Sequence, residues 1–380
     1  MLYVYVVKFN SHKNNIIYYE GTKIQKSMKI LNKKIGVNNR TYFVADIAAN
    51  HDGKLSRALK LIRLAAKAGA DAAKFQHFKA ETIVSDYGFK NLGKITHQKK
   101  WNKSVYQVYK EASINNNWTP RLKKECHKHG LAFMTSPYDL DYVDSVHKFI
   151  DAYKIGSGDI NWHEIVDKIS KKKKPLMIAC GASNLKDIKS TIKRILKYKT
   201  NVVLMQCNTN YTNSEDNFKY LNLNVLKNFK KIFKTNKVIL GLSDHTPGHS
   251  SVLGAVALGA RVIEKHFTDN NNLSGPDHKF SMNPKTWSDM VKETRRLEFS
   301  LGDGLKKVEK NEKSTYLVQR RCLRAKENIK KGTILKKEMI IPLRPNDPRA
   351  IQPENLFKSL GKKLKKNLTM GDSIKWKDLK

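Results

Sequence analysis

The sequence GLSDHTPGHSSVLGAVALGARVIEKHF (residues 241–267) contains an apolar run, a helical pattern and a second apolar run. The first run, residues 238–242, is typical of a buried strand, and residues 250–258 have the apolar spacing of a helix. Two parallel strands joined by a helix form a right-handed unit, and the carboxyl ends of both strands lie at the same edge. His245 and His266 follow these strands, so we expect their imidazoles to lie close together and to bind one divalent metal ion.

The same alternation of apolar runs and helical patterns recurs along residues 41–304. Helical patterns are clear at residues 55–68, 120–129 and 284–301. Eight runs are typical of strands: residues 42–48, 72–78, 131–137, 152–158, 175–181, 201–207, 238–245 and 261–267. Eight strand–helix units predict an α/β fold, a (β/α)8 or TIM barrel, because a doubly wound sheet, the alternative, seldom needs so many.

Polar residues gather at the trailing ends of these runs, where the active sites of such barrels lie. They are Asp46 with Asn50 and His51, Lys74 with Gln76, Thr135 with Ser136, Lys154 with Ser157 and Asp159, Thr209 with Tyr211, Ser243 with Asp244 and His245, and Glu264 with His266. A lysine inside a buried strand is costly unless it meets an anion. Lys74 and Lys154 therefore predict a carboxylate or phosphate ligand.

The segments outside the barrel have a different composition. Residues 1–40 are rich in Lys and Asn without clear periodicity, which predicts an N-terminal extension or a poorly packed flank. Residues 305–315 are expected to be a linker, and residues 316–380, with short β-like segments between turns, a small β-rich domain. The long polar loop after His266 is expected to be functional, since structureless loops of this length are uncommon.

The composition also limits the class of protein. No apolar run among the 380 residues approaches the length of a membrane span, and the first residues lack the basic and cleavage regions of a signal peptide. The four cysteines have no CxxC spacing, which favours reduced thiols in a cytoplasmic protein.

The formal net charge of +39 is very high. The basic residues are scattered and have no aromatic–basic recognition motif beside them, which favours a lysine-rich solvated surface. A basic nucleic-acid-binding protein on a degenerate barrel is the alternative, and the complete polar set at the strand ends argues against it. We therefore expect neither a nucleic-acid nor a membrane partner.

Several ordered motifs resemble one family. They are DIAANHDG, KFQ, TSP, YKIGSGD, GLSDHT, EKHFT, GPDHKFSMNP and RPND, which run from residue 46 to residue 347. Together they resemble the sialic acid (N-acetylneuraminate) synthase family, including legionaminic and pseudaminic acid synthases. The resemblance covers the chain from about residue 40 to its end. It implies a barrel followed by an antifreeze-like (SAF) domain, and a domain-swapped homodimer.

The resemblance also implies a role for each matching residue. His245 and His266 would bind the divalent metal, usually Mn²⁺, with Mg²⁺ or Co²⁺ as alternatives. Lys74, Ser136 and Lys154 would hold the carboxylate end of phosphoenolpyruvate, and Ser157 and Ser243 its phosphate, with Thr209 near the phosphate. Gln76, Tyr211 and Asp277 would contact the sugar, Arg344 of the partner subunit its acyl-amino group, and Asp46 and Asp159 would handle protons.

The implied reaction condenses phosphoenolpyruvate with N-acetylmannosamine or a related acetamido sugar, giving an N-acetylneuraminate-type acid and phosphate. A legionaminic or pseudaminic acid synthase acting on a diacetamido hexose is the alternative. A third hypothesis is a phosphoenolpyruvate-dependent synthase acting on a phosphorylated sugar, against which Arg344 and the small terminal domain argue.

The sequence departs from the family pattern at a few positions. Asp46 and Asp159 replace family glutamates, Thr209 replaces an asparagine, and Ala179 replaces a phosphate-contacting serine.

A few other polar residues have a structural interpretation beside a functional one. Asp244 is either a helix cap or a catalytic acid, His51 either orients a carboxylate or caps a turn, and His249 and His278 are expected to be solvated or loop residues.

Overall fold

The computed structural model describes residues 7–10, 15–18, 27–93, 95, 98–99, 101–233 and 238–380. The chain divides into two compact units, Met1–Gly302 and Asp303–Lys380. Among the described residues, no helix is both long enough and apolar enough to span a membrane.

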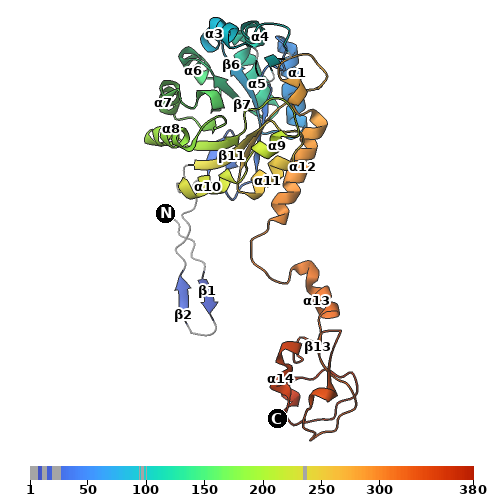
Figure 1. Cartoon of the computed structure of the whole chain (residues 1–380). Helices are drawn as coiled ribbons and strands as arrows, with labels where there is room; N and C mark the ends of the chain where they lie inside the picture. Colours follow the sequence, from blue (N-terminus) through green and yellow to red (C-terminus); the bar gives the residue numbers. More distant parts are fainter. Residues whose placement is uncertain are drawn as a thin grey trace. The chain divides into compact units, whose positions relative to one another are not determined.

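Eight parallel strands of the first unit close into a barrel (Figure 1), so the predicted (β/α)8 fold is confirmed. The closing pair is β12 beside β5, where His266 lies opposite Asp46. The strands are β5 (Tyr42–Asp46), β6 (Ala72–His77), β7 (Ala132–Pro137), β8 (Ala152–Ile155), β9 (Leu176–Ala179), β10 (Val202–Cys207), β11 (Val238–Asp244) and β12 (Val262–His266).

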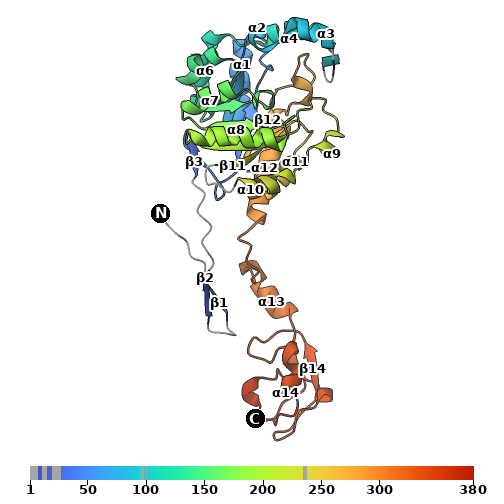
Figure 2. The ribbon, with the colours of Figure 1, turned by 60° about the vertical axis from the view of Figure 1, so that its left-hand side comes forward.

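Helices follow each strand and cover the outside of the barrel (Figure 2). Those nearest the strands are α1 (Leu55–Lys67), α5 (Thr119–Lys128), α6 (Leu140–His147), α7 (His163–Lys171), α8 (Leu185–Lys197), α10 (Val225–Ile232), α11 (Ser250–Ala257) and α12 (Pro284–Ser300). The connection from β6 to α5 adds α2 (Ala80–Ile83), α3 (Asp86–Leu92) and α4 (Val105–Ala112), and α9 (Asn217–Tyr220) precedes α10. The four helices predicted with bounds, now α1, α5, α11 and α12, begin and end within one residue of the predicted positions.

The α8 helix shows why these segments are helical. Asn184 and Asp187 form a capping box, in which each side chain accepts a hydrogen bond from the other residue's backbone amide. Ile188, Ile192 and Ile195 recur at helical spacing and are buried against the strands.

The strands alternate between two cores, because successive side chains of a strand point to opposite faces. One set packs against the helices, and the other fills the barrel interior with residues such as Val44, Met134 and Val203. Following the interior set to the carboxyl ends gives Asp46, Lys74, Gln76, Ser136, Lys154, Ser243, Glu264 and His266. The period of two thus brings the predicted polar residues to one mouth.

A short hairpin closes the amino-terminal end of the barrel. It consists of β3 (Met28–Ile30) and β4 (Lys33–Ile35), and it buries Met28, Ile30 and Ile35 in the interior core beside Tyr42. Burying three such side chains stabilises the fold by about 1.5–3 kcal/mol each. The prediction of a poorly packed flank is therefore wrong for residues 28–35. Upstream, β1 (Val7–Asn10) pairs antiparallel with β2 (Asn15–Tyr18).

The second unit is small and has its own core. It contains α13 (Lys313–Gln319), β13 (Cys322–Ala325), β14 (Ile340–Leu343) and α14 (Leu356–Ser359), joined by turns and isolated bridges. Leu323, Ile351 and Ile374 are fully buried at its centre.

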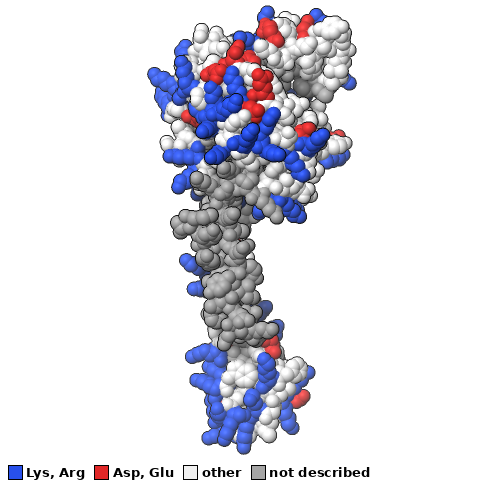
Figure 3. All heavy atoms as spheres, turned by 90° about the vertical axis from the view of Figure 1, so that its left-hand side faces the viewer, with Lys and Arg blue, Asp and Glu red and all other residues white. Residues whose placement is uncertain are grey.

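Basic side chains are not confined to one region of the described surface. Figure 3 shows lysine and arginine spread over the visible faces of both units, with acidic side chains between them on the barrel. This distribution agrees with the prediction that the basic residues are scattered over the surface.

Candidate active site

Two buried lysines meet two carboxylates in the barrel mouth. Lys74 Nζ lies 2.7 Å from Asp46 Oδ2 and 4.0 Å from Glu264 Oε1. Lys154 Nζ donates a hydrogen bond to the same Glu264 oxygen, and Ser243 Oγ donates to it at 3.2 Å. One oxygen from β12 thus links side chains from β6, β8 and β11.

The charges of this cluster shift the pKa values of its members. Burial alone would raise the pKa of Glu264, but the cations of Lys154 and Lys74 outweigh burial and lower the pKa to about 2. Burial alone would lower the pKa of Lys74, but the carboxylates of Asp46 and Glu264 raise it. Burial raises the pKa of Asp46, which Lys74 opposes only in part. Because Asp46 is the weaker acid, the site gains net positive charge when Asp46 is protonated, and can then hold an anion.

Several polar atoms in this mouth have no hydrogen-bond partner. Within the described ranges, the unpaired buried side-chain atoms include Ser136 Oγ, Thr209 Oγ1, Glu264 Oε2 and His266 Nδ1. Buried polar atoms are normally paired, so a group of unpaired ones at one place indicates a ligand site.

The turn at Gly181 brings three hydroxyl-bearing strand ends together. A Cβ at this position would lie 2.2 Å from Thr209 Oγ1 and 3.0 Å from Ser157 Oγ, so only glycine fits. The Gly181 amide donates to Ser157 Oγ at 3.0 Å, and Ser183 Oγ donates to the Gly181 carbonyl at 3.1 Å. A cradle of hydroxyl groups has the hydrogen-bonding chemistry that a phosphate needs, although Ala179 contributes no hydroxyl.

The two histidines predicted from the sequence are neighbours. Their ring centroids are 5.4 Å apart. His245 Nδ1 lies 3.0 Å from the Asn208 carbonyl and donates to it, which leaves Nε2 with a free lone pair. His266 Nε2 lies 3.5 Å from Asp46 Oδ2, and its Nδ1 has no hydrogen-bond partner.

The state of these rings suits metal binding. Burial, with a smaller contribution from His266, lowers the pKa of His245 to about 4, and burial lowers the pKa of His266 to about 3. Neutral imidazoles are the form that ligates metals. No group of three or more His, Cys, Asp or Glu side chains is placed to hold a metal in the part of the chain that the structure describes. The chemistry of the two neutral imidazoles, whose ring centroids are 5.4 Å apart, fits two ligands of one divalent ion.

Two further acids of the mouth have raised pKa values. Burial raises the pKa of Asp159 to about 6 and that of Asp277 to about 7. Asp277 Oδ2 accepts a hydrogen bond from the Ala49 amide at 3.1 Å and lies 3.8 Å from His266 Nδ1. Acids with pKa values near neutrality are suited to proton transfer.

Aromatic rings border the histidine pair. The ring centroids of Tyr211 and His245 are 4.4 Å apart, and those of Phe280 and His266 are 4.8 Å apart. A Cβ at Gly156 would have the Tyr138 hydroxyl at 3.2 Å and Asp159 Oδ2 at 3.5 Å, so both groups lie beside Gly156.

Sequence reasoning missed some of these residues. Glu264, named above only as a strand-end polar residue, is the shared partner of both lysines, and its parity with His266 on β12 was the available signal. Tyr138 directly follows β7, and Phe280 belongs to the GPDHKFSMNP motif. Position after a strand end could have indicated Tyr138, and membership of that motif could have indicated Phe280.

The structure decides the interpretations that the sequence left open. Asp244 points away from the mouth and accepts hydrogen bonds from Thr246, Ser251 and Lys265, so it is a structural acid. His51 Nδ1 accepts from the Gly53 amide at 3.1 Å and caps a turn. His278 lies in the loop after β12, as one of its two expectations had it, but solvation is wrong because the side chain is fully buried.

The two remaining predicted sugar contacts are Gln76 and Arg344. Gln76 is half-buried at the end of β6, on the same face as Lys74. Arg344 belongs to the second unit, where it is exposed and its Nε donates to the Gln319 carbonyl at 2.6 Å. Its contact with a sugar stays a prediction.

Comparison with known proteins agrees with this fold and site. The family model described as NeuB matches residues 61–306, which include most of the barrel. The chain belongs to the NeuB family. The SAF domain model matches residues 320–380, so the predicted antifreeze-like domain is also confirmed.

Members of the NeuB family with named activities match nearly the whole chain. The N,N'-diacetyllegionaminic acid synthase of Campylobacter jejuni is 34% identical over 344 residues, covering 88% of this chain and 99% of that protein. The human N-acetylneuraminate-9-phosphate synthase is 28% identical over 341 residues, covering 90% and 93%. A crystal structure of an N-acetylneuraminic acid synthetase from Leptospira borgpetersenii is 27% identical, with a TM-score of 0.66, covering 77% of this chain and 95% of that one. This NeuB chain is thus an enzyme of the group that contains sialic, legionaminic and pseudaminic acid synthases.

Proposed function

We propose that this enzyme condenses phosphoenolpyruvate with an acetamido hexose to give a nonulosonic acid and phosphate. The observation that carries the proposal is the pair of buried lysines, which share the Glu264 carboxylate beside unpaired hydroxyl groups. A site with two cations and free donors in one mouth suits a small ligand with both a carboxylate and a phosphate.

The proposed substrate fits the two halves of the cluster. Lys74, Lys154 and Ser136 would neutralise and hold the carboxylate end of phosphoenolpyruvate. Ser157, Ser243 and Thr209, around the Gly181 turn, would donate hydrogen bonds to the phosphate. Holding both ends fixes the enol carbon for attack, which lowers the entropic part of the barrier.

The acids of the mouth would move the protons. In the condensation, C3 of the enol forms a bond with the aldehyde carbon of the open-chain sugar, and the aldehyde oxygen takes up a proton. Water adds to C2, its proton passes to a carboxylate, and the C–O bond to phosphate breaks. Asp46 and Asp159 are the proposed proton carriers, because burial keeps their pKa values above those of exposed aspartates.

We also propose that His245 and His266 hold a divalent metal ion, Mn²⁺ in the first instance. When bound, the ion would supply Lewis-acid polarisation of the aldehyde oxygen. The chain's own contribution is to keep both rings neutral, with Asn208 fixing the tautomer of His245.

The sugar would bind beside these groups. Gln76, Tyr211 and Asp277 are the proposed contacts within the barrel, and Arg344 of the partner subunit would reach the acyl-amino group in a domain-swapped homodimer. N-acetylmannosamine and diacetamido hexoses are both candidates. The identity to the legionaminic acid synthase, higher than that to the N-acetylneuraminate-9-phosphate synthase, favours testing the diacetamido sugars first.

A substrate panel tests the proposal. The full chain is incubated with phosphoenolpyruvate, Mn²⁺ and each of N-acetylmannosamine, its 6-phosphate and the diacetamido hexoses. Phosphate release and the nine-carbon acid product are measured together. We expect one sugar to give equal amounts of both products, and chelation of the metal to stop the reaction.

The controls separate this proposal from its alternatives. Product from a sugar phosphate alone would favour the third hypothesis. Absence of product with every sugar, together with salt-sensitive DNA binding, would overturn the proposal in favour of the nucleic-acid-binding alternative.

A further inference from the structure

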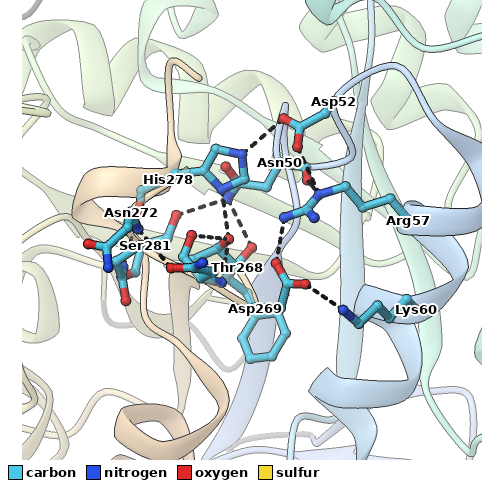
Figure 4. A network of polar contacts seen from close by, with 12 residues as sticks. Asn50, Asp52, Arg57, Lys60, Thr268, Asp269, Asn272, His278 and Ser281 are labelled. Atoms are coloured by element: carbon cyan, nitrogen blue, oxygen red, sulfur yellow. Dashed lines mark hydrogen bonds and ion pairs between the residues drawn. The ribbon is translucent and has the colours of Figure 1, made fainter. Parts of the chain in front are cut away.

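A polar network with a buried centre joins two loops on the rim of the mouth (Figure 4). One is the long loop after β12, residues 267–283, which carries Asp277. The other lies between β5 and α1, residues 47–54. Apart from Asp277, the residues of this network have no part in the proposed reaction, yet Asn50, Thr268 and His278 are fully buried polar side chains.

His278 is the centre of the network. Its side chain is 0% exposed, with Nε2 2.9 Å from Asp52 Oδ1 and Nδ1 2.7 Å from Thr268 Oγ1. A Cβ at Gly275 would lie 2.7 Å from His278 Cδ2, so only glycine lets the loop backbone pass this ring. The imidazole therefore links the loop of residues 47–54 to both arms of the long loop.

Helix α1 strengthens the link from the other side. Arg57 Nε lies 2.9 Å from the second oxygen of Asp52, and its guanidinium also pairs with Asp269. Lys60 Nζ reaches the same Asp269 carboxylate at 2.9 Å. Both loops are thus tied to one helix at the point where the long loop begins (Figure 4).

The network ends at Asp277, which it holds at two points. Ser281 Oγ donates to the Asp277 carbonyl at 2.6 Å and accepts from Asn50 Nδ2 at 2.9 Å. The carboxylate accepts from the Ala49 amide. Ala48, just before that amide, has φ of +44°, a left-handed conformation that costs a residue other than glycine free energy. The surrounding contacts must therefore stabilise this turn.

We propose that Asp52 and His278 are positioning residues that hold the Asp277 carboxyl group in the mouth and thereby set the affinity for the acceptor sugar. The pair acts through Asp277 and does not touch the substrate. This inference rests on the proposed function insofar as Asp277 contacts the sugar. The structural part, that the pair fixes the long loop, stands without it.

Replacing Asp52 by glycine and by asparagine tests the proposal. Asp52 has φ of +50°, which glycine adopts freely, so Asp52→Gly removes the carboxylate without adding strain. We expect its KM for the sugar to rise roughly tenfold or more, with KM for phosphoenolpyruvate nearly unchanged. Asp52→Asn keeps an oxygen that accepts from His278 and should restore most of the affinity.

A matched control and a double variant identify the cause. Asp151 pairs with His127 at 2.8 Å, at the opposite end of the barrel strands, so Asp151→Ala breaks a similar pair far from the sugar. It should leave both KM values unchanged. In an Asp277→Asn background, Asp52→Gly should have little further effect on KM, because coupled residues are not additive.

Hydrogen exchange separates failure of the inference from failure of the proposed function. Amides of residues 268–281 should exchange faster in Asp52→Gly than in the wild type or Asp151→Ala, whether or not any sugar is turned over. Unchanged exchange would overturn the positioning role. Equal rises in both KM values, or additive effects of Asp52→Gly and Asp277→Asn, would show that the pair only stabilises the fold. A wild type that turns over no sugar overturns the proposed function alone.

Discussion

Strand β12 contributes to two clusters of buried lysine and carboxylate groups that are built in opposite ways. Glu264 points into the mouth, where it meets Lys74 and Lys154. The next residue, Lys265, points outward, with Nζ 2.5 Å from Asp244 Oδ2 and 2.6 Å from the Thr246 carbonyl. Both clusters are almost fully buried.

The clusters differ in how completely their atoms are paired. Asp244 receives hydrogen bonds from Thr246 and Ser251 in addition to Lys265, so its oxygens are satisfied within the protein. In the mouth, Glu264 Oε2 and the neighbouring Ser136 and Thr209 hydroxyls are unpaired. A buried polar cluster that is complete by itself holds the fold together, and one with free donors and acceptors is built around something else.

The largest expected effect comes from breaking the complete cluster. Lys265→Met leaves the Asp244 carboxylate buried without its cation, which should lower the free energy of unfolding by about 3–5 kcal/mol. Urea denaturation followed by circular dichroism measures this change. The double variant Asp244→Asn/Lys265→Met removes both charges and should recover much of the loss. A loss below about 1 kcal/mol in the single variant would mean that the outer pair is not structural.

A substitution in the mouth should reduce activity more than stability. Lys154→Met should reduce kcat/KM for phosphoenolpyruvate by about 100- to 1000-fold, because a preorganised charge is lost from the site. Its stability should fall less than that of Lys265→Met, since Glu264 keeps Lys74 as a neighbour. Lys219→Met, which breaks an exposed ion pair with Asp216, is the control for loss of one positive charge. Normal turnover combined with a large loss of stability would reverse the assignment of the two clusters.

Much of this arrangement could be predicted from the sequence, because a strand alternates with a period of two. Eight apolar runs gave the barrel, and parity placed Lys74, Lys154 and His266 at one mouth. The same rule separates Glu264 and His266, which point inward, from Lys265, which points outward.

What the sequence could not show are contacts between residues far apart in the chain. Glu264 pairs with Lys154 across 110 positions, and His278 pairs with Asp52 in the loop that follows β5, 226 positions away. The β3–β4 hairpin was missed for another reason: its strands have three residues each, which is too short for periodicity to be recognised.

The smallest expected effect compares two buried aspartates by pH. Burial alone would raise the pKa of Asp244, but Lys265 outweighs it and the pKa is lowered, so the stability that Asp244 contributes is lost only as pH falls below its ordinary value of 3.8. Asp159 has no such cation, and burial raises its pKa to about 6. Its contribution is present below pH 3.8 and is lost as pH rises to about 6.

Asp159→Asn should therefore remove a pH dependence that the wild type has. Between about pH 4 and pH 6, the free energy of unfolding of the wild type should fall relative to the variant by at most about 1.4 kcal/mol per pH unit. The difference between the wild type and Asp244→Asn should stay constant in this range, since Asp244 titrates below it. Denaturation at pH 4, 5, 6 and 7 measures both differences. Parallel curves for the wild type and Asp159→Asn would mean that folding does not raise the pKa of Asp159, and an aspartate with its ordinary pKa would be a poor proton acceptor near neutrality.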